Sequence, residues 1–527
     1  SNLTIMTLNI IKRTAICFSL LTAISCTDNF DEMNQNPVGA TTPDLEQNFN
    51  NIKGLIKPAF TRLYISDVTW QYQLQQSLQA DGWSGYMTSP NEFGGINNHS
   101  YNLNPGWNTY AWDDAYVNII ANLFKVEQRA KGKYDQFYAW SLIIKVATMQ
   151  RITDMYGPAV YSKFGGEGLA TYDSQQQIYT QMFKDLDFAV TDLTARVASG
   201  EVSKFTETDQ SNYGGSYEQW VKYANSLRLR LAMRISKVDP ALAKTEAEKA
   251  VSHSIGVFKI NNDLIKIKSP LDLNVIDVMS HVWVGLSMGA DMESILVGYD
   301  DPRLAKYWEP STQVPGEYRG VRTGIVYPTP STYANFSRTG ARTKTGEVTW
   351  MSTAEVYFLR AEGALRGWNM DGAAKDLYEA GIKASFDQNG VEGAAAYIAD
   401  NVKVAKDYVD PVNAANNAPA VSKVTVAWGA TNEINLEKII TQKWIATYPD
   451  GQEAWSEYRR TGYPKLFRIT NNKSGGIIST ELGVRRLPFA QSEATNNPKG
   501  VESGVAVLGG PDNGATRLWW DVDKANF

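Results

Sequence analysis

Residues 220–238 read WVKYANSLRLRLAMRISKV, and the spacing of their apolar side chains decides the fold class. Apolar residues recur at steps of three and four, which places them along one face of a helix. This stripe consists of Trp220, Ala224, Leu227, Leu231, Ile235 and Val238. Arg228, Arg230 and Arg234 decorate the same helix, where we expect a solvated or salt-bridged face. The stretch therefore predicts a long amphipathic helix.

Two further helices are predicted before this one. Apolar side chains follow helical steps through residues 178–197, and Ser174 with Gln177 forms a capping box at the start of that segment. Residues 137–147 carry the same period and mark an antiparallel partner. The middle of the chain is therefore predicted to contain packed helices.

A second helical pair is predicted at residues 352–386. Ser352 with Glu355 forms another capping box, Gly367 supplies a stop, and Asp371 can cap the second helix. Small residues on both segments would let the two helices approach closely. Pairs of this kind resemble tetratricopeptide units, although the strict consensus of those repeats is not met.

One more helix is predicted at residues 436–447, and long irregular stretches separate the helical segments. These stretches are rich in Gly, Asn, Pro, Ser and Thr, and loops of such length usually carry function. They cover residues 81–112, 157–173, 300–350, 400–432 and 470–527. We therefore expect a mainly all-α fold of helical pairs, in one interlocked unit without a clean interdomain linker.

The composition limits what kind of protein this is. The chain has 527 residues, of which 43% are hydrophobic and 20% are charged, so it is not a largely disordered protein. The formal net charge of −5 leaves no broad basic excess, and we expect no nucleic-acid footprint. Cys17 and Cys26 are the two cysteines, which excludes a disulfide framework, a cysteine-rich zinc site or a thiol nucleophile beyond residue 26.

The N-terminal segment explains the two cysteines. Lys12 and Arg13 precede an apolar run at residues 14–24, which is the layout of a signal peptide and is too short to span a membrane. The run ends in Ser25-Cys26, which resembles a bacterial lipobox. We expect a signal peptide at residues 1–25, lipidation at Cys26, a flexible tether at residues 26–45 and a single domain at residues 46–527. The alternative is an ordinary secretory signal with an incidental cysteine.

Most catalytic chemistries find no support in the sequence. Residues 285–289 match the G-x-S-x-G nucleophile elbow, but the histidine of that triad follows its serine, and all three histidines precede Ser287. No H-E-x-x-H, P-loop or EF-hand pattern occurs, so we expect no enzyme, cofactor or metal site. A glycosidase needs only two carboxylates brought together in space, and the sequence cannot exclude that arrangement.

The aromatic-rich stretch at residues 81–116 is the strongest positive feature. Aromatic faces stack on the C–H face of a sugar ring, and the interleaved asparagine amides can hydrogen-bond to hydroxyls. The candidate ligand contacts are Trp83, Tyr86, Asn97, Asn98, Tyr101 and Trp107, with Trp283 from the second half of the chain. For each of these residues, a place in the core is about as good an explanation as a ligand contact. Trp107, Trp112 and Tyr116 in particular can simply close the core over a helix.

A series of motifs gives the chain a family resemblance. They are residues 151–158 (RITDMYGP), the helix at 220–235, residues 300–304 (DDPRL), 448–455 (YPDGQEAW), 459–464 (RRTGYP), 485–489 (RRLPF) and the terminal Trp519-Trp520-Asp521. In this order, and with the lipobox-like start, they resemble the SusD/RagB family of surface lipoproteins of Bacteroidetes-type bacteria. The match is to the SusD-like branch that ends in Trp-Trp-Asp.

The resemblance implies a fold and a task. It implies about four tetratricopeptide-like helical pairs, with irregular loops packed on one side. It also implies a non-enzymatic lid that captures nutrients, most simply oligosaccharides, and delivers them to a SusC-like TonB-dependent outer-membrane barrel. The shared motifs look like fold elements: Gly157-Pro158 can end a helix, and Arg459 and Arg460 can pair with acids near Trp455.

Two other functions stay open from the sequence. RagB-like members of the family serve peptide uptake, so the ligand can be a peptide instead of a glycan. A surface glycosidase is the less favoured third reading. The sequence does not identify the glycan or its linkage, and it does not say whether calcium binds.

Overall fold

The computed structural model describes residues 46–93, 97–168 and 170–527. The predicted signal peptide, the tether and Cys26 lie outside the described residues. The chain divides into two compact units, Ser1–Asn51 and Ile52–Phe527. The described part of the first unit contains a 3₁₀ turn at Gln47–Phe49 and the start of α4 (Asn50–Ile56). All that follows concerns the second unit.

The helix predicted from residues 220–238 is α13 (Tyr217–Arg234). Ser216 caps it, because the Ser216 hydroxyl accepts the backbone N–H of Gln219. The predicted apolar stripe is fully buried as far as Ile235. Val238 lies beyond the end of α13. It belongs to the short turn that leads into the next helix, which starts at Pro240.

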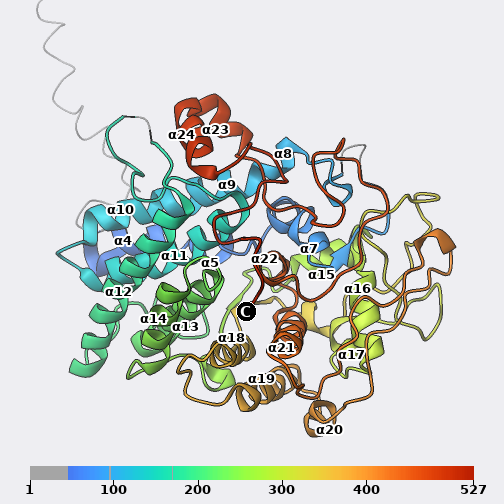
Figure 1. Ribbon diagram of the computed structural model, residues 1–527. Helices are drawn as coiled ribbons and strands as arrows, with labels where there is room; N and C mark the ends of the chain where they lie inside the picture. The colour runs from blue at the N-terminus through green and yellow to red at the C-terminus, as the bar shows by residue number, and fades with distance from the viewer. Residues whose placement is uncertain (1–45, 94–96, 169) are drawn as a thin grey trace, which may run out of the picture. The chain divides into compact units, whose positions relative to one another are not determined.

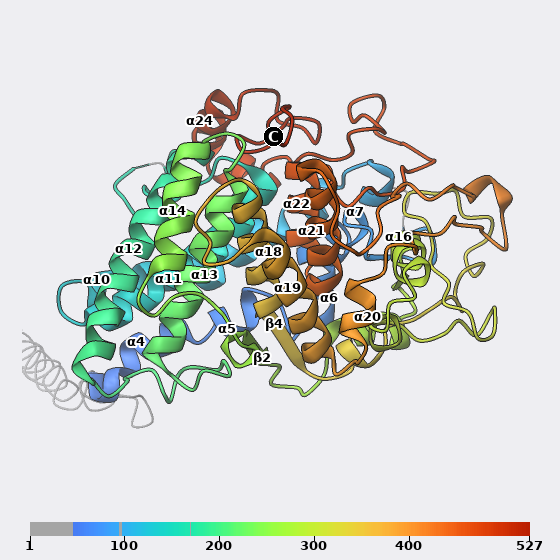
Figure 2. The same cartoon turned by 60° about the horizontal axis from the view of Figure 1, so that its bottom comes forward.

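Four pairs of successive helices build the scaffold, which confirms the mainly all-α, tetratricopeptide-like prediction. Helices of a pair contact each other, and the second pair packs on the third through α13 and α18. The pairs are α11 (Asp135–Tyr156) with α12 (Gln175–Ser199), α13 with α14 (Pro240–Ser252), α18 (Thr353–Leu365) with α19 (Ala374–Asn389), and α21 (Asn432–Thr447) with α22 (Gly451–Thr461). Figure 2 shows the first two pairs beside the third, with the irregular segments around α16 and α20 on the far side of α21.

Shorter elements connect and cover these pairs (Figure 1). The remaining α-helices of the described residues are α5 (Ala59–Arg62), α6 (Thr69–Tyr72), α7 (Ala80–Trp83), α8 (Pro105–Asn108), α9 (Tyr110–Asp114), α10 (Ala121–Ala130), α15 (Val275–Asp277), α16 (Ala290–Met292), α17 (Leu304–Tyr307), α20 (Ala394–Ile398), α23 (Gln491–Asn496) and α24 (Pro498–Leu508). Of these, α8, α17, α23 and α24 lie in stretches that the sequence predicts to be irregular. None of the described helices is both long and apolar enough to cross a bilayer.

In the part of the chain that the structure describes, two small antiparallel sheets connect the irregular segments. β1 (Met87–Thr88) pairs with β3 (Ser287–Met288), and β2 (Ile265–Lys268) pairs with β4 (Glu347–Met351). In the first sheet Met87 lies opposite Met288, and Thr88 lies opposite Ser287. This pairing joins the aromatic-rich stretch to the segment that contains Trp283.

The predicted helix caps are confirmed in part. At α12 the capping box of Ser174 and Gln177 is complete. At α18 the hydroxyl of Ser352 accepts the backbone N–H of Glu355, but the carboxylate of Glu355 binds the Arg230 guanidinium instead of closing the box. The prediction for Asp371 is wrong: α19 starts at Ala374, too far away to be capped by it, and the Asp371 carboxylate pairs with a lysine at 3.3 Å.

Close packing within the third pair follows from its small residues, as predicted. A Cβ placed on Gly381 of α19 would lie 2.7 Å from a ring carbon of Phe358 on α18. The glycine therefore lets the two helices approach. Gly367, with a φ of 83°, follows the end of α18 and supplies the predicted stop.

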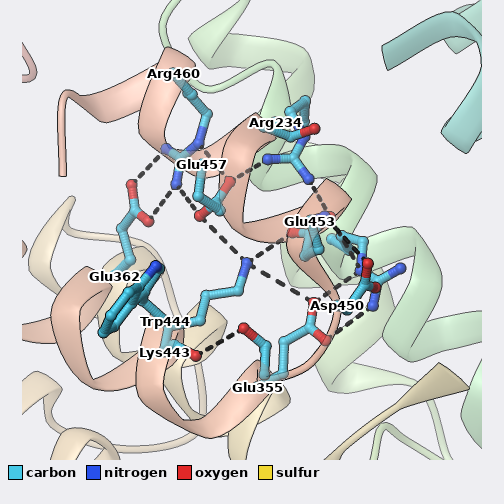
Figure 3. A network of polar contacts seen from close by, with 12 residues as sticks. Arg234, Glu355, Glu362, Lys443, Trp444, Asp450, Glu453, Glu457 and Arg460 are labelled. Carbon is cyan, nitrogen blue, oxygen red and sulfur yellow. Dashed lines mark hydrogen bonds and ion pairs between the residues drawn. The ribbon is translucent and has the colours of Figure 1, made fainter. Parts of the chain in front are cut away.

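The arginines of α13 are buried, so the solvated alternative for that helix face is wrong and the salt-bridged alternative is confirmed. Figure 3 shows the ion network around Arg234, while Arg228 pairs separately with Asp187 and Glu246. Arg234 pairs with Glu453 and Glu457 of α22 and, at 3.3 Å, with Asp154 of α11. Arg230 pairs with Glu355 of α18 at 2.7 Å.

The network extends to two more cations from the last helical pair. Lys443 of α21 lies 2.9 Å from Glu453 and 3.2 Å from Glu457, and Arg460 of α22 lies 2.7 Å from both Glu457 and Glu362. Burial alone would raise the pKa of Glu453, but Arg234, Lys443 and Arg230 lower it to about 2. The network thus joins five helices of the scaffold through charges that are compensated inside the protein.

Candidate functional site

The stretch at residues 81–116 is a chain of short elements instead of one open loop. It contains the end of α7, strand β1, a 3₁₀ turn at Asn98–Ser100, and helices α8 and α9. Asn104 caps α8 by accepting the backbone N–H of Gly106 at 3.0 Å, and Pro105 occupies the first helical position. Several of the asparagines in this stretch therefore serve local turns.

Trp83 and Tyr86, two of the predicted ligand contacts, lie inside the protein. Trp83 is 8% exposed, packs on Trp455 with ring centroids 4.9 Å apart, and donates its indole N–H to the Asn98 carbonyl. Tyr86 is fully buried, and its hydroxyl donates to the carbonyl of Trp444. Both side chains join the stretch to the last helical pair, which is the core role considered for them in the sequence.

The predicted asparagine contacts and Tyr101 shape the loop backbone. The Asn98 amide is buried and exchanges hydrogen bonds with the Asn108 amide. The Asn97 side chain accepts the backbone N–H of His99 at 2.9 Å. Tyr101 is 9% exposed and has a φ of 66°, so it turns the chain after the 3₁₀ segment. These residues position the surface that the stretch presents.

Trp107 and Trp283 are the two predicted contacts that offer a ring to solvent. Trp283 is 44% exposed and follows a π-helical segment at Val278–Val282. Trp107 is half-buried in α8 and packs on Phe93, which is 43% exposed, with ring centroids 5.5 Å apart. We call Phe93, Trp107 and Trp283 the aromatic surface group.

The β1–β3 pairing links the chain segment that leads to Phe93 with the segment that follows Trp283. The antiparallel pairing covers Met87–Thr88 and Ser287–Met288, so the two segments meet at these residues. Phe93 follows Thr88 by five positions, and Trp283 precedes Ser287 by four. The same segment is also held by Tyr327, whose hydroxyl donates to the Ser89 carbonyl at 2.7 Å. Phe93 had not been singled out in the sequence, although its place in the aromatic-rich stretch was a signal.

The serine of the G-x-S-x-G match and the histidine of the aromatic-rich stretch are both buried. Ser287 lies in β3 and is buried, not on a strand-to-helix turn where a nucleophile would be presented. His99 is buried, and burial lowers its pKa to about 4, which keeps the imidazole neutral. Among the described residues, no three His, Cys, Asp or Glu side chains group as a metal site.

Arg459 and Arg460 differ in how their charges are balanced. Arg460 pairs with Glu362 and Glu457, as predicted. Arg459 instead stacks over the Trp455 ring at 3.4 Å and donates to the carbonyls of Trp455 and Arg485. No carboxylate of the described residues pairs with it, so the predicted acid partner of Arg459 is wrong. Gly157 ends α11, as predicted.

The protein combines a scaffold of helical pairs with exposed aromatic rings on irregular segments. The model of the SusD-like family, the SusD and RagB outer membrane lipoproteins, matches residues 32–521. The chain belongs to this family, and the resemblance read from its motifs is confirmed. Comparison with curated proteins found no match.

Solved structures agree with this assignment. A chitin-binding SusD homologue from Flavobacterium johnsoniae is 57% identical, with a TM-score of 0.90 over 91% of this chain and 100% of the other. A SusD homologue from Bacteroides vulgatus is 38% identical, with a TM-score of 0.87 over 92% of this chain and 100% of the other. A structure described as a chitin-binding protein is 28% identical, with a TM-score of 0.73 over 90% and 100% of the two chains.

Proposed function

We propose that the protein captures oligosaccharides of N-acetylglucosamine, as chitin fragments, without cleaving them. The observation that carries the proposal is the exposed ring of Trp283, in a chain 57% identical to a chitin-binding SusD homologue. An indole face stacks on the C–H face of a pyranose ring, and such aromatic contacts contribute about 0.5–1.5 kcal/mol beyond the area that they bury. Trp107 with Phe93 supplies a second platform for another sugar unit.

Trp283→Ala is expected to weaken the binding of chitohexaose by about two- to tenfold, because one stacking face is lost at 1.4 kcal/mol per decade. Isothermal titration calorimetry measures the change. Trp70→Ala is the matched control, since Trp70 is 51% exposed and packs on Tyr110, outside the aromatic surface group. It should bind like the parent.

Three results would count against this proposal. If Trp283→Ala and Trp107→Ala both bind chitohexaose like the parent, the aromatic surface group is not the site. If the parent binds members of a peptide library and no glycan, the peptide-capturing alternative is right. If the parent releases new reducing ends from chitin fragments, the protein is a glycosidase and not a binding protein.

Membrane attachment and delivery belong to the same proposal and rest on the family, whose members are outer membrane lipoproteins. We propose a lipid anchor at Cys26, display on the cell surface and delivery of the glycan to a SusC-like TonB-dependent barrel. One experiment addresses both steps: cells are fed radiolabelled palmitate, and the protein is purified from detergent-solubilised membranes. The label should enter the parent and be absent from Cys26→Ser, and a barrel should co-purify with the parent. A labelled Cys26→Ser variant, or recovery of the parent alone, would contradict the respective step.

A further inference from the structure

A cavity of about 350 Å³ lies at the C-terminal end of α22, and none of the aromatic surface group lines it. Its walls come from the start of α21, the end of α22, the turn after α13, and segments of the chain that follow α22. Seven Lys or Arg side chains and three Asp or Glu side chains line it. The lining therefore carries a formal charge of 7 − 3 = +4, although the whole chain has a net charge of −5.

Acids behind the cavity wall balance part of this charge. Arg460 is neutralised by the ion network described above. Arg485 and Arg517 share the single carboxylate of Asp521, at 2.5 and 2.9 Å. Arg468 pairs with Glu481 at 3.1 Å. Asp521 is thus the close acid for both of these arginines. A second acid, Asp523, lies farther away, 3.8 Å from Arg517.

The other cations of the cavity have no carboxylate partner among the described residues. The Lys237 ammonium donates to the Arg460 carbonyl at 3.1 Å and has further N–H groups to offer. Arg459 is 3% exposed. A carbonyl group accepts a hydrogen bond from its guanidinium and the Trp455 ring stacks on it, but neither carries a negative charge. Burial lowers the pKa of Lys237 to about 8 and that of Arg459 to about 9. Asp521 attracts both groups from a longer distance, but no carboxylate of the described residues lies within ion-pair distance of either, so an anion in the cavity would stabilise them further.

One acceptor in the cavity wall also lacks a partner. The Asn526 amide nitrogen donates to the Glu433 carboxylate at 2.9 Å and to the Thr461 carbonyl at 3.1 Å. These bonds fix the orientation of the amide, and its Oδ1 is buried without a hydrogen-bond donor. A buried acceptor left unpaired is energetically unfavourable. Because this oxygen is closed off from solvent, a ligand in the cavity has no access to it, and the ligand contacts come from the cationic side chains.

We propose that this cavity binds the carboxylate of a small acid, of which a hexuronic acid is the simplest sugar example. The carboxylate faces the cationic wall that includes Lys237 and Arg517. Arginine forks match carboxylate geometry, and the volume falls within the range of small-molecule sites. The site is independent of the aromatic surface group, so the protein would recognise an acidic sugar in addition to the proposed neutral glycan.

The test uses sodium glucuronate as the probe, with glucose and inorganic phosphate compared at equal ionic strength. Ligand-detected NMR titrations of the purified protein give the affinities. Glucuronate should bind and glucose should not. Lys237→Gln should weaken glucuronate binding by about tenfold or more, because a hydrogen bond to a charged group contributes about 1.5–3 kcal/mol. Lys524→Gln, at the exposed rim, should give a smaller loss without any risk to folding.

Two control variants separate this site from general charge effects and from the proposed glycan site. Lys249→Gln removes a half-exposed lysine of α14 that pairs with Asp187 outside the cavity, and it should bind glucuronate like the parent. Trp283→Ala should also bind glucuronate like the parent. No binding of glucuronate, unchanged binding by both Lys237→Gln and Lys524→Gln, or phosphate binding as tight as glucuronate binding would each overturn the proposal.

Discussion

Arg234→Met is expected to lower the free energy of unfolding by about 3–5 kcal/mol, because it removes one cation from a buried network of charges. Arg234 is 1% exposed and contacts the carboxylates of Glu453, Glu457 and Asp154. Without it, these carboxylates keep their desolvation penalty and lose a principal compensating charge. Methionine is similar in length, so the loss reports the charge more than the packing. Denaturation by guanidinium, followed by circular dichroism, measures the change.

Arg196→Met is the matched control. Arg196 of α12 pairs with Asp192 at 2.7 Å and Glu201 at 2.8 Å, but its side chain is 21% exposed, and pairs in water contribute about 0–1 kcal/mol. The double variant Arg234→Met, Glu453→Gln should recover part of the lost stability, since one uncompensated carboxylate is gone. Equal denaturation midpoints for Arg234→Met and the parent would contradict the role given to the network.

The same network shows where the sequence stops being informative. The period of apolar residues predicted α13 correctly, because helical geometry alone places every third or fourth side chain on one face. The spacing of apolar residues could not show whether the Arg234 side chain faces solvent or pairs with carboxylates. Its partners Glu453 and Glu457 lie more than 200 residues away in the sequence. Their spacing of four on α22 puts both on one helix face, but only tertiary packing brings that face to α13.

In the candidate site, too, the sequence predicted local features but not the tertiary packing. Trp83 and Trp283 both lie close to glycines in the sequence and looked alike as possible sugar platforms. Burial separates them: Trp83 packs on Trp455 of α22, whereas Trp283 remains 44% exposed. The aromatic composition of residues 81–116 indicated an unusual segment, but composition alone does not show which of its rings are buried in the core. The β1–β3 pairing, which no local pattern revealed, ties Trp283 to that segment.

Burial also affects an acid close to this sheet. Asp291 of α16 is 7% exposed, and one of its carboxylate oxygens accepts the backbone N–H of Phe467 at 2.8 Å. Burial raises the pKa of Asp291 from 3.8 to about 7, although the nearby Arg322 opposes the shift. At pH values between these two, the folded protein holds a proton that the unfolded chain has released.

Asp291→Asn is therefore expected to remove a pH dependence from the stability of the parent. As the pH rises from about 4 to 7, the parent loses about 1.4 kcal/mol per pH unit through this group, or about 4 kcal/mol in all. Asparagine mimics the protonated acid, since its Oδ1 can still accept the Phe467 N–H and it carries no charge. The variant should match the parent near pH 4 and be more stable by about 4 kcal/mol at pH 8. Asp523→Asn, at a side chain that is 91% exposed, should keep the slope of the parent. Guanidinium denaturation at a series of pH values decides the matter, and parallel stability curves for Asp291→Asn and the parent would show that Asp291 is charged in the folded state throughout this range.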